Sequence, residues 1–182
     1  LFLPGPWKHQ PAYVTIAAND GEIKRIVLPD SSVVTLNARS EIRFQQGGKN
    51  NSRDVFLDGE AFFEIHPDNN KPFIVHTDGM QTQVLGTSFN IKYYPGEKLT
   101  VGVLTGKVTV PAAEGPSHVL PRGEKTIYNP SAGVFTSINE EPQEMNAWQQ
   151  GIINMNNLTL EEVATVLERW YSVKIILESP GI

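Results

Sequence analysis

The residues whose types could support catalysis are a serine and two glutamates, all in β-type segments. Ser88 lies in Gly86-Thr-Ser-Phe-Asn, one residue short of the Gly-x-Ser-x-Gly nucleophile elbow, because Asn90 replaces the second glycine and no helical pattern follows. Glu60 and Glu64 are four residues apart on one predicted strand, which separates the carboxylates by about 13 Å, more than the ~5–9.5 Å that glycosidases use. We interpret both glutamates as exposed strand charges and expect no catalytic residue.

Two histidines are the candidates for a metal site. His66 and His76 end neighbouring predicted strands and could meet across a hairpin, with Asp68 as an oxygen ligand. Neither an HxH nor an HExxH spacing is present, and the chain has no cysteine. The sequence therefore predicts no metal, no cofactor and no enzymatic activity, and we expect chelation to leave the melting temperature unchanged.

Composition narrows the class of partner. The 182 residues include 15 Lys and Arg against 20 Asp and Glu, for a net charge of −5, and no basic run that could bind a nucleic-acid backbone. No apolar stretch reaches the 18 residues of a membrane helix. The chain begins at Leu1 rather than Met, so we interpret it as part of a longer protein whose upstream segment carries any membrane anchor.

Alternating, β-branched segments separated by turn residues extend from Tyr13 to Ser137. The expected strands are Tyr13–Ala18, Ile23–Leu28, Val33–Leu36, Arg53–Asp58, Glu60–Ile65, Phe73–Thr77, Phe89–Tyr93, Leu99–Leu104, Lys107–Val110 and Lys125–Asn129. This pattern predicts a mainly β fold, an antiparallel or solenoid-like β-sandwich, over residues 1–138.

Side-chain alternation predicts which strand faces are buried. Val101 and Val103 share one face, opposite Gly102, and are expected in the core. Phe62 shares a face with Glu60 and Glu64 and therefore needs cover from another layer.

Two glycines are expected to be fixed by backbone geometry. Asp58-Gly59 is a hairpin dipeptide, and Gly86 interrupts an apolar run, so both glycines are predicted to need a positive φ or a close approach between chains.

The pattern changes after a polar, proline-bearing linker at residues 139–147. Gly151–Met155 and Val173–Leu177 read as strands, and Thr159 with Glu162 forms a capping box before a helix. The apolar residues at helical spacing are Leu160, Val163, Ala164, Leu167, Trp170 and Tyr171. Residues 148–182 are thus predicted to form a small β-α-β unit. Such a unit buries too little apolar surface to be stable alone, so the β domain, a second copy or further chain must cover it.

Several motifs in order along the chain resemble the periplasmic domain of the FecR family. They are Leu28-Pro-Asp-Ser-Ser-Val-Val-Thr-Leu-Asn-Ala-Arg-Ser, Leu57-Asp-Gly-Glu-Ala-Phe-Phe-Glu-Ile, Lys71-Pro-Phe-Ile-Val-His-Thr, Val84-Leu-Gly-Thr-Ser-Phe-Asn-Ile, Leu104-Thr-Gly-Lys-Val, Leu120-Pro-Arg-Gly-Glu and Ala147-Trp-Gln-Gln-Gly. The C-terminal unit resembles the short secretin- and TonB-type module that follows in these proteins.

One position departs from the family pattern. The family usually has Asp-Gly-Ser where this chain has Asp30-Ser31-Ser32. Because Ser tolerates a positive φ poorly, we expect a different turn type here, or Asp30 in the left-handed position.

The resemblance implies a function. Proteins similar to FecR are inner-membrane anti-sigma factors with one membrane helix and a periplasmic sensor, which receives a signal from an outer-membrane TonB-dependent transducer and relays it to an extracytoplasmic-function sigma factor. By this similarity the chain would be the periplasmic sensor, with the sigma-binding segment and the helix upstream. It implies two protein partners, the signalling domain of the transducer and the sigma factor.

The predicted docking surface lies on the C-terminal unit, because its strand edges could accept a partner strand. The residues expected to contribute are Trp148, Ile152, Asn154, Met155, Val173 and Ile175. The alternative is a small-molecule or carbohydrate-binding β domain in which Phe62, Tyr93 and Tyr94 are exposed and stack on a ligand.

Overall fold

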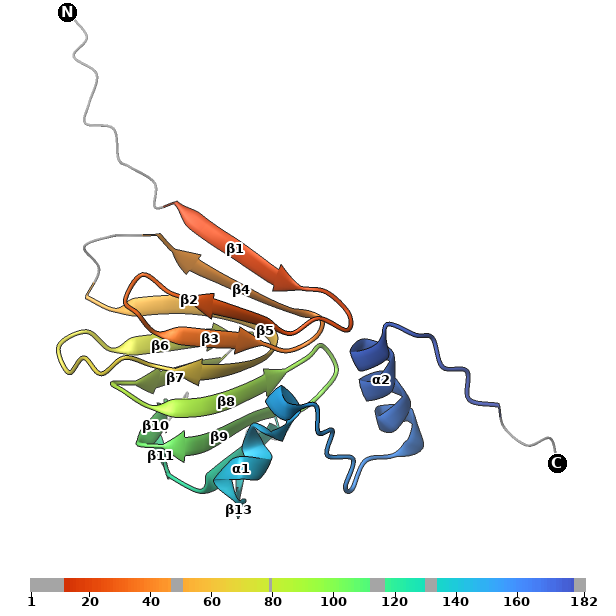
Figure 1. Ribbon diagram of the computed structural model, residues 1–182. Helices are drawn as coiled ribbons and strands as arrows, with labels where there is room; N and C mark the ends of the chain where they lie inside the picture. The colour runs from red at the N-terminus through yellow and green to blue at the C-terminus, as the bar shows by residue number, and fades with distance from the viewer. Residues whose placement is uncertain (1–11, 47–50, 79, 112–116, 130–133, 179–182) are drawn as a thin grey trace, which may run out of the picture.

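The structure is a computed structural model that describes residues 12–46, 51–78, 80–111, 117–129 and 134–178. Its thirteen described strands form one curled sheet whose two halves face each other, with a helical C-terminal segment at one side (Figure 1). The predicted mainly β fold with a small C-terminal unit is therefore confirmed.

The strands divide into two halves that share β5, Arg53–Glu64. The first half, sheet A, has the order β1-β4-β5-β6-β7-β10-β11, and the second, sheet B, has the order β2-β3-β5-β8-β9-β12-β13. The bounds in sheet A are β1 Tyr13–Ala18, β4 Ser40–Gln45, β6 Phe73–Thr77, β7 Met80–Val84, β10 Lys107–Val110 and β11 His118–Pro121. In sheet B they are β2 Lys24–Val27, β3 Val33–Leu36, β8 Ser88–Tyr93, β9 Leu99–Thr105, β12 Glu124–Asn129 and β13 Val134–Asn139.

Consecutive hairpins alternate between the two halves. The pairs β6–β7 and β10–β11 lie in sheet A, whereas β8–β9 and β12–β13 lie in sheet B. Among the described pairs only β5 with β6 is parallel, because the chain returns from sheet B to sheet A between them. This alternation gives the sandwich its solenoid-like character.

Gly59 is the point where β5 passes from one sheet to the other. Residues before it pair with β4, and residues from Gly59 onward pair with β8. Its φ is +98°, and a Cβ atom at this position would lie 2.4 Å from the Ser40 Oγ atom. The predicted positive φ and close approach are present, but the predicted hairpin at Asp58-Gly59 is wrong, because β5 continues through the bend as one strand.

Gly86 lies where the chain crosses from β7 to β8. A Cβ atom at this position would come within 2.7 Å of the Pro67 Cα atom. The expected close approach is therefore present, without a left-handed backbone.

The inward-facing side chains of both halves form one apolar core. Phe63 of sheet B stacks on Phe89 at 4.9 Å between ring centroids and meets Phe73 of sheet A edge to face at 6.1 Å. Val101 and Val103 are fully buried, as the alternation predicts. A sandwich of this kind gains most of its stability from such contacts between facing sheets.

The outer face of sheet B is also partly covered. The sequence did not predict that Gly102, on this face, would be buried. Met145 packs on Gly102, so that a Cβ atom there would lie 2.9 Å from its Sδ atom. Phe62 lies in the same cross-strand row, through Asn90, and is 5% exposed. The cover that Phe62 was expected to need is present.

Four strands, β4, β7, β11 and β13, were not predicted. In β7 the buried side chains are Met80, Thr82 and Val84, so a polar residue occupies a core position. In β13 almost every side chain is exposed, and its order comes from pairing with β12. Pairing with a neighbouring strand orders such segments, and their own composition does not signal it.

The turn between β2 and β3 does not have Asp30 in the left-handed position, so that one of the two expectations for it is wrong. Ser31 itself has the left-handed backbone, at φ +69°. The Asp30 carboxylate accepts hydrogen bonds from the backbone N–H of Ser32 at 3.0 Å and from its hydroxyl at 2.7 Å. These bonds fix the turn despite the unfavourable φ of Ser31.

The C-terminal segment contains α1 (Pro142–Met145), the 3₁₀ helix η1 (Ala147–Gln150) and α2 (Leu160–Tyr171). Residues 139–147, predicted to be a linker, thus include the last residue of β13, all of α1 and the first residue of η1, and α1 lies against β9 (Figure 1). The capping box of Thr159 and Glu162 at the start of α2 is confirmed. None of the helices in the described part of the chain has the length and hydropathy needed to cross a bilayer.

The two strands predicted to flank α2 are not formed. Residues 151–155 and the segment 173–177 have no strand assignment. A strand exists only when its backbone groups pair with a neighbour, and no described strand is adjacent to either segment.

Candidate functional site

The candidate site is the junction where the C-terminal segment meets sheet B and the turn before β4. A chain of buried polar side chains begins at Trp148, whose indole Nε1 donates to the Asn90 Oδ1 atom at 3.1 Å. The Asn90 amide donates to one Glu60 carboxylate oxygen at 2.9 Å, and the Asn37 amide donates to the other at 2.8 Å. Glu60 is therefore a structural acceptor, and the interpretation of it as an exposed strand charge is wrong.

Tyr94 forms the second part of the junction. Its ring is 3% exposed, and its hydroxyl donates to the Ala38 carbonyl at 2.8 Å and lies 3.2 Å from the Ser40 Oγ atom. Burial raises the pKa of the Tyr94 phenol, and the nearby Glu60 carboxylate adds to the rise. The neutral hydroxyl is thus the form that fits this site.

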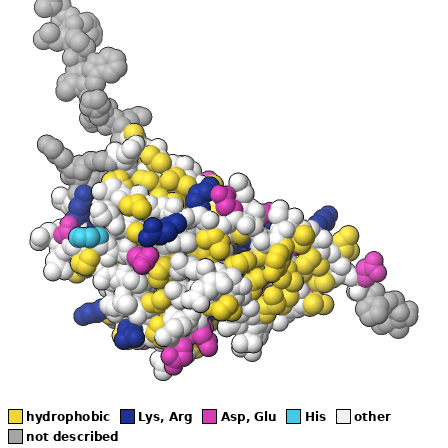
Figure 2. Space-filling model, viewed as in Figure 1, with side chains coloured by type: hydrophobic (Ala, Val, Ile, Leu, Met, Phe, Trp, Pro, Cys, Tyr) yellow, Lys and Arg dark blue, Asp and Glu magenta, His cyan; other side chains and the backbone are white. Residues whose placement is uncertain are grey.

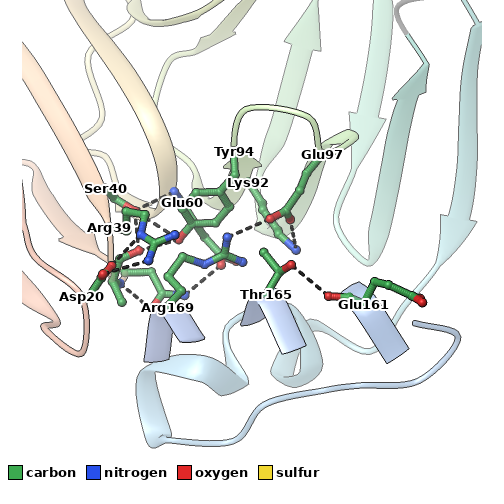
Figure 3. A network of polar contacts seen from close by, with 12 residues as sticks. Asp20, Arg39, Ser40, Glu60, Lys92, Tyr94, Glu97, Glu161, Thr165 and Arg169 are labelled. Carbon is green, nitrogen blue, oxygen red and sulfur yellow. Dashed lines mark hydrogen bonds and ion pairs between the residues drawn. The ribbon is translucent and has the colours of Figure 1, made fainter. Parts of the chain in front are cut away.

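Arg169 of α2 reaches into this region from the helix (Figure 3). Its guanidinium carbon lies 3.5 Å from the centroid of the Tyr94 ring, and its Nη1 atom donates to the Glu97 carboxylate at 2.7 Å. Glu97 also pairs with Lys92 at 2.8 Å. Burial alone would raise the pKa of Glu97, but Lys92 and Arg169 outweigh it and the pKa is lowered. A cation over an aromatic face and a paired carboxylate together hold the guanidinium.

A backbone contact completes the attachment of α2. The N–H of Gly21, in the turn between β1 and β2, donates to the Arg169 carbonyl oxygen at 2.9 Å. Nearby, the Asp20 carboxylate accepts two hydrogen bonds from Arg39, at 2.6 and 2.8 Å. The end of α2 is therefore fixed to the β domain through polar groups.

The apolar stripe predicted for the helix is only partly buried. Ala164 within it is buried, whereas Leu160 and Tyr171 within it are 65% and 64% exposed. Val166 and Arg169, which lie outside the predicted stripe, are also buried. Tertiary contacts thus bury residues beside the stripe and leave apolar side chains at both of its ends uncovered.

An apolar surface therefore remains on α2 and the segments beside it. Figure 2 shows hydrophobic side chains gathered over this region, at the right of the view. We call it the C-terminal apolar surface, and its residues, all at least 41% exposed, are Ile152, Leu160, Tyr171, Val173, Ile176 and Leu177.

The residues predicted to dock a partner are divided by the structure. Ile152, Asn154 and Val173 are exposed, and Met155 and Ile175 are half-buried. Trp148 is 7% exposed and faces Asn90, so it positions the segment instead of presenting a contact surface.

The alternative ligand surface is not present as predicted. Phe62 and Tyr94 are 5% and 3% exposed, so neither ring offers a face for stacking. Tyr93 alone of the three is half-buried.

The catalytic and metal-binding candidates do not assemble. His76 pairs with Asp54 at 2.7 Å and stacks on Phe56. Ser88 is half-buried, and its backbone N–H donates to the Thr105 hydroxyl. Among the described residues, no group of three or more His, Asp or Glu side chains could hold a metal ion.

Sequence reasoning missed Arg169 and Glu97, and it assigned Tyr94 to an exposed ligand surface although the ring is buried. The available signal was Arg169 itself, a charged residue beside Trp170 in the last turn of an amphipathic helix. Its partners are about 70 residues earlier in the chain, and local pattern cannot connect them.

Comparisons with known proteins agree on one family. Residues 14–109 match the family model for FecR protein, and residues 152–182 match the model for the C-terminal region of FecR. No curated protein matches the chain.

Two crystal structures of a candidate anti-sigma factor from Parabacteroides distasonis ATCC 8503 are similar to the chain. They are 38% and 39% identical in sequence, with TM-scores of 0.83 and 0.82. The similarity covers 88% and 87% of this chain, and 76% and 75% of theirs. Family models and related structures lead to one conclusion: the chain belongs to the FecR family.

Proposed function

We propose that this chain is the signal-receiving domain of a membrane-anchored anti-sigma factor and acts in the periplasm. It binds the signalling domain of an outer-membrane TonB-dependent transducer, and the upstream part of the same protein regulates an extracytoplasmic-function sigma factor. Membership of the FecR family and the likeness to a candidate anti-sigma factor support the regulatory role. The partner identities follow from the family resemblance.

The observation that carries this proposal is the C-terminal apolar surface. Six large apolar side chains remain exposed on a short segment, although the β domain beside them has a closed core. Exposed apolar side chains gathered in one region are typical of protein-binding surfaces. The C-terminal apolar surface consists of side chains suited to binding a protein, which agrees with a role in receiving a signal.

The mode of docking follows from the unpaired segments. Residues 151–155 and 173–177 have strand-forming sequences but no strand neighbour among the described residues. We propose that a strand of the signalling domain pairs with one of them while its apolar side chains cover the C-terminal apolar surface. Ile152, Asn154, Met155, Val173 and Ile175 would then contribute to docking, and Trp148 would position them.

Calorimetric titration with purified signalling domains of the organism's TonB-dependent transducers, one at a time, tests the proposal. Ile176→Glu places a charge on the C-terminal apolar surface and should weaken binding at least tenfold, by about 1.4 kcal/mol. Val27→Glu is the matched control, because Val27 on β2 is also exposed, at 64%, but lies on the β domain. Its affinity should equal that of the parent.

Asn154→Pro tests strand pairing separately, because proline removes one backbone donor. It should weaken binding while circular dichroism shows an intact β domain. If both Ile176→Glu and Asn154→Pro bind as tightly as the parent, docking occurs elsewhere. If no signalling domain binds the parent, the proposed function is wrong.

A further inference from the structure

The attachment of α2 to the β domain differs in kind from the packing inside that domain. The buried apolar cluster of the structure consists of residues from the β domain, and of the described residues none on α2 belongs to it. The two buried apolar residues of the helix, Ala164 and Val166, are small or medium in size. The contacts that join the end of α2 to the β domain are instead those of Arg169, through its side chain and its carbonyl oxygen.

The socket that receives Arg169 is complete without it. Glu97 keeps its ion pair with Lys92, and the Tyr94 hydroxyl keeps its hydrogen bond to the Ala38 carbonyl. Departure of the helix would therefore leave no buried, unpaired carboxylate or hydroxyl on the β domain. Breaking a buried ion pair usually costs stability because one charge is left buried without a partner. The β domain does not incur this cost when α2 departs.

Arg169 is itself incompletely satisfied in the docked position. Its side chain is 4% exposed, yet its Nε atom is buried without a hydrogen-bond partner among the residues that the structure describes. Release would let water reach this group and the rest of the guanidinium. A partly satisfied buried polar group lowers the stability of the state that contains it. Both sides of the contact thus favour a docked state that can open.

We propose that Arg169 is a reversible latch, which holds α2 on the β domain in a docked state and releases it when a partner binds. The coupling to the partner rests on the proposed function. Val166 is buried and lies three residues before Arg169, on the same face of α2, so release would uncover it in addition to Leu160 and Tyr171 and enlarge the apolar surface of the helix. A partner that covers the enlarged surface binds the released state more tightly and shifts the equilibrium toward it.

The Gly21 amide reports docking directly. Its acceptor is the Arg169 carbonyl on α2, while Gly21 itself belongs to the β domain. Its hydrogen-exchange rate therefore measures contact between the two parts and not the integrity of either. The amide of Phe63, in the core strand β5, reports the stability of the sandwich in the same experiment.

Arg169→Ala is the informative variant, because alanine has the highest helix propensity and α2 should remain helical. In this variant the Gly21 amide should exchange at least tenfold faster than in the parent, while the Phe63 amide is unchanged. Thr165→Ala is the matched control on the same helix, because the hydroxyl of exposed Thr165 bonds only within α2, to the Glu161 carbonyl. Its Gly21 rate should equal that of the parent.

Three results would overturn the latch. The first is an unchanged hydrogen-exchange rate of the Gly21 amide in Arg169→Ala. The second is an equal acceleration of exchange at Gly21 and Phe63, which would indicate general destabilisation. The third is a parent protein in which the Gly21 amide is not protected from exchange.

Titration with the signalling domain tests the coupling. Arg169→Ala should bind at least threefold more tightly than the parent or Thr165→Ala, because its helix is already released. Equal or weaker binding would refute the coupling. A parent that binds no signalling domain would refute the proposed function and the coupling with it, whereas the Gly21 rate would still decide whether Arg169 is a latch.

Discussion

Two buried arginines show how differently the β domain and the C-terminal segment are held. Arg53 in β5 donates to the Asp30 carboxylate, to the Lys71 carbonyl and to the His66 carbonyl, all within 2.9 Å. Arg169 in α2 donates through its side chain to Glu97, and its Nε atom has no hydrogen-bond partner in the described part of the chain. Both guanidinium groups lie near an aromatic ring.

The difference lies in what each arginine joins. Arg53 connects the β2–β3 turn, the loop after β5 and the segment before β6, so its removal would break three hydrogen bonds at once. Arg169 connects one helix to a socket that is already satisfied. A buried charge with many partners fixes a fold, whereas one with few partners can control a movable contact.

We expect the largest loss of stability when Arg53 of the β domain is replaced. Arg53→Ala should lower the free energy of unfolding by roughly 3–5 kcal/mol, because three hydrogen bonds of a charged guanidinium are lost together. Arg169→Ala should lower it by less than about 1 kcal/mol, since the helix leaves without unfolding the sandwich. Urea denaturation followed by circular dichroism measures both. Similar losses in the two variants would remove the distinction between the regions.

The second prediction concerns the close packing of the β domain. Gly59→Ala adds a Cβ atom at positive φ and against Ser40, and should lower the free energy of unfolding by about 2–4 kcal/mol. Gly96→Ala is the control, because Gly96 has φ +81° but no atom within 4 Å of the added Cβ. It should lose only about 1 kcal/mol, from backbone strain. Equal thermal melts for the two variants would mean that the approach of Ser40 does not constrain β5.

Acid should weaken both arginine contacts. Burial acts to raise the pKa values of Asp30 and Glu97, but hydrogen bonds and cations outweigh it, and both pKa values are lowered. A lowered pKa stabilises the folded state above the ordinary pKa of the group, and that stability is lost as pH falls through the folded-state value.

Below a pH of about 4, we therefore expect a lower free energy of unfolding and a lower protection factor for the Gly21 amide. The protection factor, corrected for intrinsic exchange, should become insensitive to acid in Glu97→Gln. If the protection factor of the Gly21 amide still falls in acid in this variant, a titrating group other than Glu97 controls the docking of α2.

The smallest effect is a gain. Ser31→Gly removes a β-carbon from a residue at φ +69° and should stabilise the protein by about 1 kcal/mol. Ser32→Gly, at the next position, should destabilise it, because the buried Ser32 hydroxyl bonds Asp30 and accepts the His66 N–H. Differential scanning calorimetry distinguishes the two. If the melting temperature of Ser31→Gly is equal to or lower than that of the parent, the backbone of Ser31 is not strained in this turn.

Elements with a local sequence signal could be predicted before the fold was known. Alternation placed Val101 and Val103 in the core, the pairing of Thr159 with Glu162 started α2, and Gly59 and Gly86 marked close approaches. Each of these signals lies within a few positions of the sequence, although the atoms that approach Gly59 and Gly86 belong to Ser40 and Pro67. The chain's motifs likewise indicated the family to which it belongs.

Tertiary structure decided whatever depends on residues far apart in the chain. Gly59 was read as a hairpin, because only the pairing of β5 with both β4 and β8 shows that the strand bends and continues. Residues 151–155 have a strand sequence but pair with no strand among the described residues. Arg169 became the contact of α2 because Tyr94 and Glu97, distant in sequence, lie beside it. Local patterns determine which secondary structure a segment prefers. The strand that pairs with its backbone, and the groups that pair with its buried charges, are determined only when the chain has folded.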